Sequence, residues 1–162
     1  MKAKDLMIPL EEHLRPETTL REAVNLLRSA RRGGERIGVK GLPVLDPAGH
    51  MIGFLSMGDI LKAVLPFYMS NLSLGEFSWQ GMEEDIARKS ADRQVGELMT
   101  RKVISVHEDS HLMACVESMV KNNVKSLPVL NREDRVVGML YEADVFFAIT
   151  RMMLQEDGES KR

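Results

Sequence analysis

The sequence predicts a mixed α/β protein that is built from two tandem copies of one unit. The segment GLPVLD at 41–46 recurs as SLPVLN at 126–131, and GFLSMGDI at 53–60 recurs as GMLYEADV at 138–145, both displaced by 85 residues. Near the start of each copy, DLM at 5–7 matches ELM at 97–99, displaced by 92 residues. Blocks that recur in one order indicate an internal repeat. The first copy therefore holds seven extra residues, which fall within 28–38.

A helix follows the opening Leu-Met block in each copy. In the first copy, Thr19 and Glu22 fit a capping box, and the apolar positions 20, 23, 24 and 27 form one helical face. The same spacing at 112, 115, 116 and 119 predicts the helix of the second copy, which is expected to begin near Asp109 or Ser110.

A pair of strands and a closing helix complete each copy. The first strand is expected around Leu-Pro-Val-Leu, followed by a turn at 46–49 or 131–134 and a second strand at 51–55 or 136–140. The closing helices are predicted at 57–65, where Pro66 ends the helix, and at 142–153.

These elements divide the chain into a first repeat at 1–65, a connecting segment at 66–93, a second repeat at 94–154 and a polar tail at 155–162. The connecting segment holds Phe67, Tyr68, Phe77 and Trp79, half of the eight aromatic residues. A disordered linker is seldom so rich in aromatic residues. We therefore expect part of it to pack on the repeats or on a second subunit, with a short helix over 82–89.

Composition excludes several classes of protein. The 162 residues carry 22 basic and 24 acidic side chains, so the chain lacks the basic excess of a general nucleic-acid binder. A single cysteine excludes an internal disulfide framework and favours a reducing, cytoplasmic compartment. Apolar runs are far shorter than a membrane span, so no contact with a membrane is expected.

Two polar residues, Ser56 and Asp59, stand where the second strand of the first copy enters its closing helix. Free backbone N–H groups and the helix dipole favour an anion at such a position. Ser56 can donate a hydrogen bond to a phosphate oxygen, and Asp59 can accept hydrogen bonds from both hydroxyls of a ribose. The pair also fits a capping box that needs no ligand, and both interpretations stay open.

The ordered set of an opening Leu-Met, a helix, Leu-Pro-Val and Gly-x-Leu-Ser-x-x-Asp, present twice with Tyr141 in place of Ser in the second copy, resembles the cystathionine β-synthase (CBS) domain. Two copies in one chain resemble a Bateman module, and the match covers 4–63 and 95–148. The resemblance implies two β-α-β-β-α units that pack through their sheets about a pseudo-twofold axis. It also implies clefts between the units where adenine nucleotides bind, and a homodimer.

By this resemblance, Ser56 is expected to contact a phosphate and Asp59 a ribose, while Asp144 is the ribose candidate of the second copy. Tyr141 stands where the family pattern has Ser or Thr, and its larger phenol is expected to occupy the phosphate position or to contact the base. The cleft with Ser56 and Asp59 is therefore the stronger candidate. The adenine is expected against the first strands of the two hairpins and against a strand at 103–106. The residues expected there are Leu42, Pro43, Val44, Ile104, Leu127, Pro128 and Val129.

The insertion at 28–38 carries four arginines, and Lys40 follows it. Cations are favourable at the C-terminus of a helix, and Gly33 and Gly34 are typical of a helix stop. Contact with a polyphosphate or an acidic partner is the alternative. No aromatic residue lies among these arginines, which makes binding of nucleic acid a weaker interpretation.

Other residues favour ordinary structural roles. His107 and His111 fall at a strand end and a helix start, without a third ligand, so a metal site is not expected. Cys115 corresponds to Ala23 on the core face of its helix and is predicted to be buried. The methionines, twelve in all, are expected in the core or at a subunit contact. No motif of a nucleophile, a P-loop or paired catalytic carboxylates is present, so the sequence does not predict an enzyme.

Together these observations favour a regulatory module that requires no cofactor and binds AMP, ADP or ATP. Binding would change the arrangement of the two repeats, or of two subunits, and so act on a partner protein, because a ligand signals only when it favours one arrangement. The alternative is an adaptor dimer whose clefts are empty or are filled by Tyr141 and the aromatic segment at 66–93.

Overall fold

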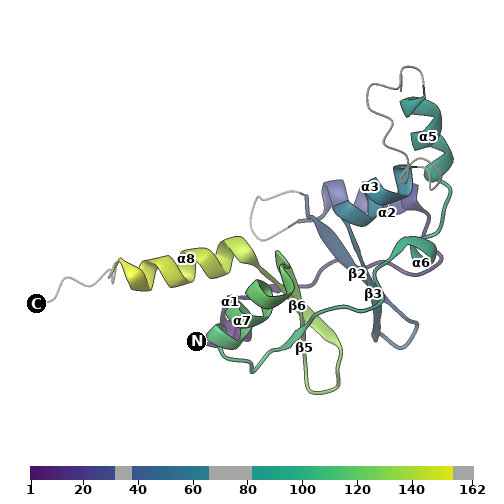
Figure 1. Cartoon of the computed structure of the whole chain (residues 1–162). Coiled ribbons are helices and arrows are strands. Elements are labelled where there is room, and N and C mark those ends of the chain that lie inside the picture. Colours follow the sequence, from purple (N-terminus) through teal and green to yellow (C-terminus); the bar gives the residue numbers. More distant parts are fainter. Residues whose placement is uncertain (32–37, 66–81, 155–162) are drawn as a thin grey trace, which may run out of the picture. The chain divides into compact units, whose positions relative to one another are not determined.

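The computed structural model describes residues 1–31, 38–65 and 82–154, and the chain divides into two compact units (Figure 1). Unit 1 comprises Met1–Leu10 and Ile104–Arg162, and unit 2 comprises Glu11–Val103. The units therefore differ from the sequence repeats at their first segments. The opening segment of the first repeat lies in unit 1, and the segment at 95–103, which opens the second repeat, lies in unit 2.

Unit 2 is built on an antiparallel hairpin of β2 (Gly41–Leu45) and β3 (Met51–Ser56), in which Gly41 pairs with Ser56. Isolated bridges extend the hairpin on both edges, from Leu14 to β2 and from Thr100 to β3. The helices of this unit are α2 (Leu20–Ser29), α3 (Met57–Val64), α5 (Glu83–Ser90) and α6 (Val95–Leu98).

Helix α2 forms for the reason that its sequence predicts. Thr19 Oγ1 accepts a hydrogen bond from the N–H of Glu22, and the Glu22 carboxylate accepts one from the N–H of Thr19, so the capping box is complete. The apolar face of the helix packs into a buried cluster with the hairpin and with Val95 and Met99 of the segment at 95–103. This core belongs to unit 2 alone.

Unit 1 has a sheet with the strand order β1-β6-β5-β4. These strands are β1 (Ile8–Pro9), β6 (Val136–Tyr141), β5 (Ser126–Leu130) and β4 (Val106–His107), and the helices are α1 (Ala3–Leu6), α7 (Leu112–Asn122) and α8 (Glu142–Met153). The register shifts between Val129 and Leu130, as it does between Val44 and Leu45 in unit 2. The repeats predicted from the sequence therefore form equivalent hairpins.

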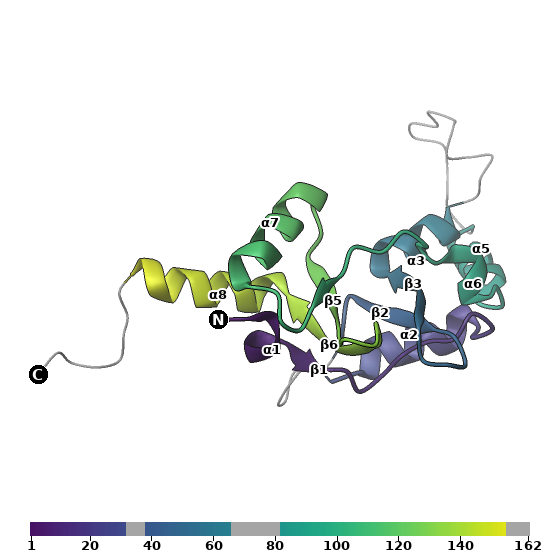
Figure 2. The ribbon, with the colours of Figure 1, turned by 90° about the horizontal axis from the view of Figure 1, so that it is seen from below.

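The opening segment at 1–10 is held in unit 1 by backbone and side-chain contacts, with α1 and β1 beside β6 (Figure 2). The N–H of Ala3 donates to the carbonyl of Ser110 at 2.8 Å. Lys4 Nζ donates to Asp109 Oδ1 at 3.0 Å, and this hydrogen bond lowers the pKa of Asp109. At Gly138 a Cβ would lie 2.8 Å from the carbonyl oxygen of Ile8, so the close approach of β1 requires glycine there.

The element boundaries agree with the predictions except at a few ends. Helix α7 begins at Leu112 with His111 as its N-cap, because Ser110 instead accepts a hydrogen bond from the N–H of His107 at 3.1 Å in the preceding turn. The strand expected at 103–106 is shorter and lies at Val106–His107. The predicted helix at 82–89 is α5. The four aromatic residues of the connecting segment, and Arg32 and Arg36, lie outside the described residues.

Cys115 is fully buried, as predicted, and burial raises the pKa of its thiol. His107 contacts Asp134 at 3.1 Å. Within 1–31, 38–65 and 82–154, no group of three metal-ligating side chains occurs. In the same residues no helix is both long and apolar enough to span a membrane.

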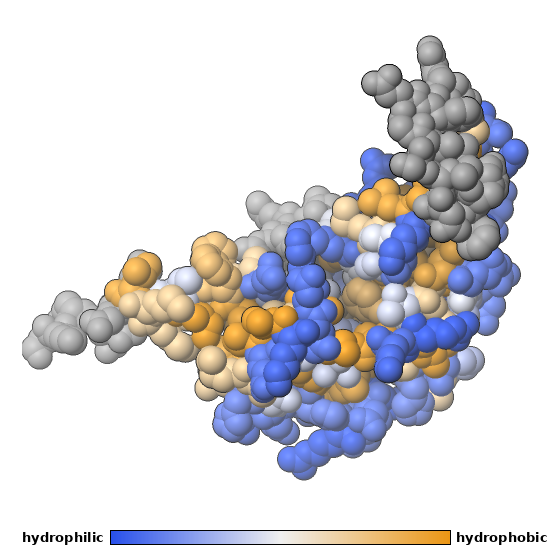
Figure 3. All heavy atoms as spheres, in the orientation of Figure 1, coloured by the Kyte–Doolittle hydropathy of each residue, from blue (hydrophilic) through white to orange (hydrophobic). Residues whose placement is uncertain are grey.

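The methionines are divided between the core and the surface. Met119 and Met139 are buried, whereas Met113, Met152 and Met153 are exposed. Helix α8 carries four exposed large apolar side chains, and orange and tan spheres cover it at the left of Figure 3. These are Phe146, Phe147, Met152 and Met153.

Candidate functional site

The strand-to-helix junction of unit 2 brings Ser56 and Asp59 together. Ser56 is the N-cap of α3, and its Oγ accepts a hydrogen bond from the N–H of Asp59 at 3.2 Å. The Asp59 carboxylate in turn accepts hydrogen bonds from the N–H of Ser56 at 2.9 Å and from its hydroxyl at 3.0 Å. The capping-box interpretation is therefore confirmed, and the carboxylate is fixed at the first turn of the helix.

A third side chain, Thr100, completes this junction. Its Oγ1 lies 3.1 Å from Asp59 Oδ1 and 3.3 Å from Oδ2, so the hydroxyl donates to the carboxylate. Thr100 is positioned by two backbone hydrogen bonds of 2.8 Å with Phe54 in β3. The segment that opens the second repeat thus supplies a residue beside the polar pair of the first repeat.

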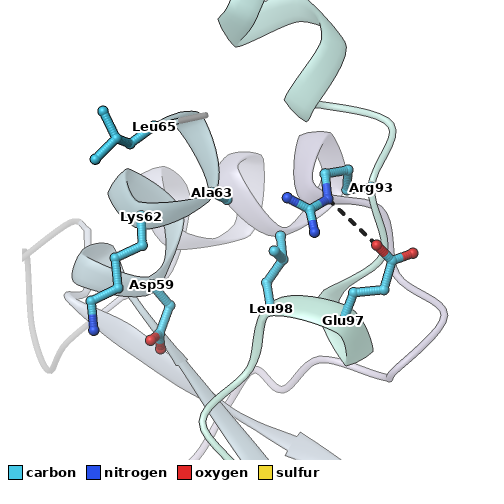
Figure 4. Close-up of a pocket in the computed structure, with 7 residues that line it drawn as sticks. All are labelled: Asp59, Lys62, Ala63, Leu65, Arg93, Glu97 and Leu98. Carbon is cyan, nitrogen blue, oxygen red and sulfur yellow. Dashed lines mark hydrogen bonds and ion pairs between the residues drawn. The ribbon is translucent and has the colours of Figure 1, made fainter. Parts of the chain in front are cut away.

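Asp59 also lines a pocket of about 500 Å³ within unit 2 (Figure 4). Its walls come from α3, from α6 and from the residue that precedes the α6 N-cap. The lining residues are Asp59, Lys62, Ala63, Leu65, Arg93, Glu97 and Leu98. A volume of this size suits a small organic ligand.

The charged side chains of the pocket lie on two sides of Leu98. Figure 4 shows the side chains of Asp59 and Lys62 pointing in one direction from α3, and Arg93 paired with Glu97 on the other side. The Arg93 Nε lies 3.4 Å from Glu97 Oε2. The pocket thus offers hydrogen-bond acceptors for hydroxyl groups and cations for an anionic group, on an apolar floor.

The equivalent junction of unit 1 places Tyr141 and Asp144 at the start of α8. Tyr141 is the N-cap and makes no side-chain cap hydrogen bond, as expected for a phenol in place of a hydroxymethyl group. Asp144 lies in the first helical turn and is half-buried. The two junctions thus share the carboxylate position and differ at the cap.

The apolar residues expected around an adenine are mostly interior. Leu42 and Val44 belong to the buried core of unit 2, and Leu127 and Val129 to that of unit 1. Pro43 and Pro128 alternate to the opposite face of their strands and are also buried. Ile104 is half-buried against the core of unit 1.

Sequence reasoning missed Thr100 and the pocket residues Lys62, Arg93 and Glu97. Thr100 directly follows the Leu-Met block that defines the repeat, and Lys62 follows Asp59 by one helical turn. The sequence therefore held a signal for these two residues. Arg93 and Glu97 reach the pocket only because the segment at 95–103 packs in unit 2, which no local pattern indicates.

Comparison with known proteins identifies relatives over most of the chain. A family model described as the CBS domain matches residues 3–66 and 95–151. The sequence is 29% identical over 123 residues to "Uncharacterized protein MJ1426" of Methanocaldococcus jannaschii, a match that covers 68% of this chain and 73% of that protein.

Solved structures share the fold. The structure of CBSX2 in complex with AMP has a TM-score of 0.67 at 21% identity and covers 94% of this chain and 98% of that one. The cytosolic domain of the Mg²⁺ channel MgtE in complex with ATP has a TM-score of 0.65 at 24% identity, covering 91% of this chain and 48% of that one. The α/β fold of two tandem repeats, predicted from the sequence, is thereby confirmed.

Proposed function

This chain belongs to the CBS-domain family, and we propose that it is a regulatory module that binds an adenine nucleotide at the junction of β3 and α3. One observation carries the proposal: Asp59 is fixed by Ser56 and Thr100 at a helix start and lines a pocket of about 500 Å³. Structures of CBSX2 with AMP and of the MgtE cytosolic domain with ATP support an adenine nucleotide as the ligand class.

In this proposal Asp59 binds the ribose and Ser56 contacts a phosphate. Asp59 already accepts hydrogen bonds from the N–H and the hydroxyl of Ser56 and from the hydroxyl of Thr100, which leaves about one of its four acceptor positions. The ribose hydroxyls therefore replace side-chain donors at Asp59, and the released Ser56 hydroxyl can then donate to the phosphate. The N–H groups at the start of α3 favour a phosphate beside Ser56. AMP, ADP and ATP all present these two groups.

Binding is proposed to act on a partner protein through a ligand-dependent rearrangement of the repeats or of a dimer, without catalysis and without a required cofactor. Such a signal requires that the nucleotide bind one arrangement more tightly than another. The single cysteine, which is buried and has no second cysteine in the sequence to pair with, supports a cytoplasmic setting.

A homodimer is part of the proposal. The exposed apolar residues of α8 include Phe146 and Phe147, whose rings contact each other edge to face with centroids 5.6 Å apart. Contiguous exposed apolar surface is typical of a protein interface. Sedimentation equilibrium is expected to give a mass near twice 18.3 kDa, and to give a monomer for Phe146→Glu.

Calorimetric titration with AMP and ATP tests the nucleotide site. Wild-type protein is expected to bind, and Asp59→Asn to bind at least about tenfold more weakly, because hydrogen bonds to a charged acceptor contribute about 1.5–3 kcal/mol. Glu22→Gln is the matched control, since Glu22 holds the same place in the capping box of α2 but lies outside the pocket.

Equal affinity of wild-type protein and Asp59→Asn would remove Asp59 from the site. If no adenine nucleotide raises the melting temperature of the wild type, the adaptor interpretation replaces the sensor, because any ligand that binds only the native state raises the midpoint.

A further inference from the structure

The four charged side chains of the unit 2 pocket are unevenly paired. The Arg93 guanidinium is held by Glu97 at 3.4 Å, and Asp59 accepts hydrogen bonds from Ser56 and Thr100. Lys62 makes no hydrogen bond or ion pair with any other residue that the structure describes. The pocket therefore offers one cation without a partner among these residues and a second cation that is paired with a carboxylate.

The internal repeat provides a comparison for this arrangement. At the displacement of 85 residues, Phe147 in the second repeat corresponds to Lys62. At the displacement of 92 residues, Met1 in the first repeat corresponds to Arg93. Phe147 and Met1 are 60% and 57% exposed in unit 1. The carboxylate is kept in both copies, as Asp59 and Asp144, whereas both cations are confined to unit 2. The two cations of this pocket are thus specific to unit 2.

Glu97 differs from its repeat equivalent in what its carboxylate does. In unit 1 the equivalent Asp5 accepts a hydrogen bond from the N–H of Lys2 at 2.8 Å and so caps α1. Helix α6 has no side-chain cap, and the longer Glu97 side chain pairs with Arg93 instead. The carboxylate of Glu97 therefore sets the charge of the pocket and is not needed to start its own helix.

We propose that this charge pattern makes the unit 2 pocket selective for a nucleoside monophosphate over a triphosphate, with Glu97 as the residue that disfavours additional phosphates. This inference rests on the proposed function. The pocket holds two cations and two carboxylates and is neutral as a whole. The phosphate that Ser56 contacts is attracted by Lys62, the cation of the pocket that has no partner among the described residues. Each added phosphate brings further negative charge to a pocket that already holds the carboxylates of Asp59 and Glu97 and whose second cation, Arg93, is paired.

The test is calorimetric titration of the full chain with AMP and with ATP at low ionic strength, where charge effects are least screened, and without Mg²⁺. The readout is the ratio of the ATP and AMP dissociation constants. Glu97→Gln is expected to lower this ratio by about five- to tenfold, because it frees Arg93 and removes a repelling charge. Lys62→Gln is expected to weaken AMP binding by a similar factor.

Glu84→Gln is the matched control. Glu84 forms an i,i+4 ion pair with Arg88 on α5, as Glu97 does with Arg93, but neither residue of the Glu84 pair lines the pocket. A change of net charge alone would alter the ratio equally in both variants, and that result would overturn the inference. An unchanged ratio in Glu97→Gln, with both nucleotides still bound, would also overturn the inference. That result would leave the proposed function standing. Absence of binding of both nucleotides to the wild type would overturn the proposed function itself.

Discussion

Gly138 shows how a single position controls the packing of unit 1. Because a Cβ there would lie 2.8 Å from the backbone oxygen of Ile8 and from Met7 Sδ, Gly138→Ala must displace β1. We expect the free energy of unfolding to fall by about 1–3 kcal/mol, as for other overpacked sites, in a urea titration.

Gly58→Ala is the control for this substitution. Its Cβ would be 3.6 Å from Ser56 Oγ, an ordinary contact, and Gly58 lies in the first turn of α3. Alanine there is expected to be neutral or to stabilise the protein by up to about 1 kcal/mol. Equal stability of Gly138→Ala and the wild type would show that β1 does not pack against β6 as described.

Residues that interact locally could be predicted from the sequence, and residues that meet across the chain could not. Ser56 and Asp59 are three positions apart, so helix geometry alone brings them together. Thr100 reaches the same carboxylate from 41 positions away. That contact depends on how the segment at 95–103 packs, and neither propensity nor periodicity carries this information.

At the scale of elements, the first helices of the two repeats differ in their caps. Thr19 caps α2 through a complete capping box, whereas His111, its repeat equivalent, makes no side-chain cap hydrogen bond to α7. Thr19→Ala is therefore expected to lower the free energy of unfolding by about 1 kcal/mol, and His111→Ala to change it by less than about 0.5 kcal/mol. Urea unfolding of both variants measures the difference, and equal losses would contradict it.

Long periodic elements were predictable, and short strands were not. The apolar positions of α2 and α7, and the strand pairs around Leu-Pro-Val-Leu, follow from sequence spacing. Strands β1 and β4 have two residues each and exist only as partners of β6 and β5. A segment this short has no periodicity of its own, so its pairing is decided by tertiary contacts.

For the whole molecule, the distinction between repeat and compact unit has a physical consequence. The core of unit 2 includes Val95 and Met99, and the N–H of Val95 and that of Gly96 donate to the carbonyls of Thr18 and Pro16 at 2.8 Å. The core of unit 1 includes Ala3, whose segment precedes unit 2 in the chain. Neither repeat, taken alone as a stretch of sequence, contains all the residues of one core.

The fragment 11–103 is therefore expected to fold by itself, whereas the first repeat at 1–65 is not. The longer fragment is continuous in sequence and holds the whole buried cluster of unit 2 together with the bridge from Thr100 to Phe54. The shorter one lacks Val95 and Met99, which leaves a cavity in the core, and it leaves β3 without its partner at Thr100. Each buried side chain removed in this way costs about 2–5 kcal/mol, a large share of the stability of a small domain. Dispersed amide resonances and a cooperative urea transition are expected for 11–103 alone. Cooperative folding of 1–65, with 11–103 unfolded, would show that the sequence repeat and not the compact unit is what folds.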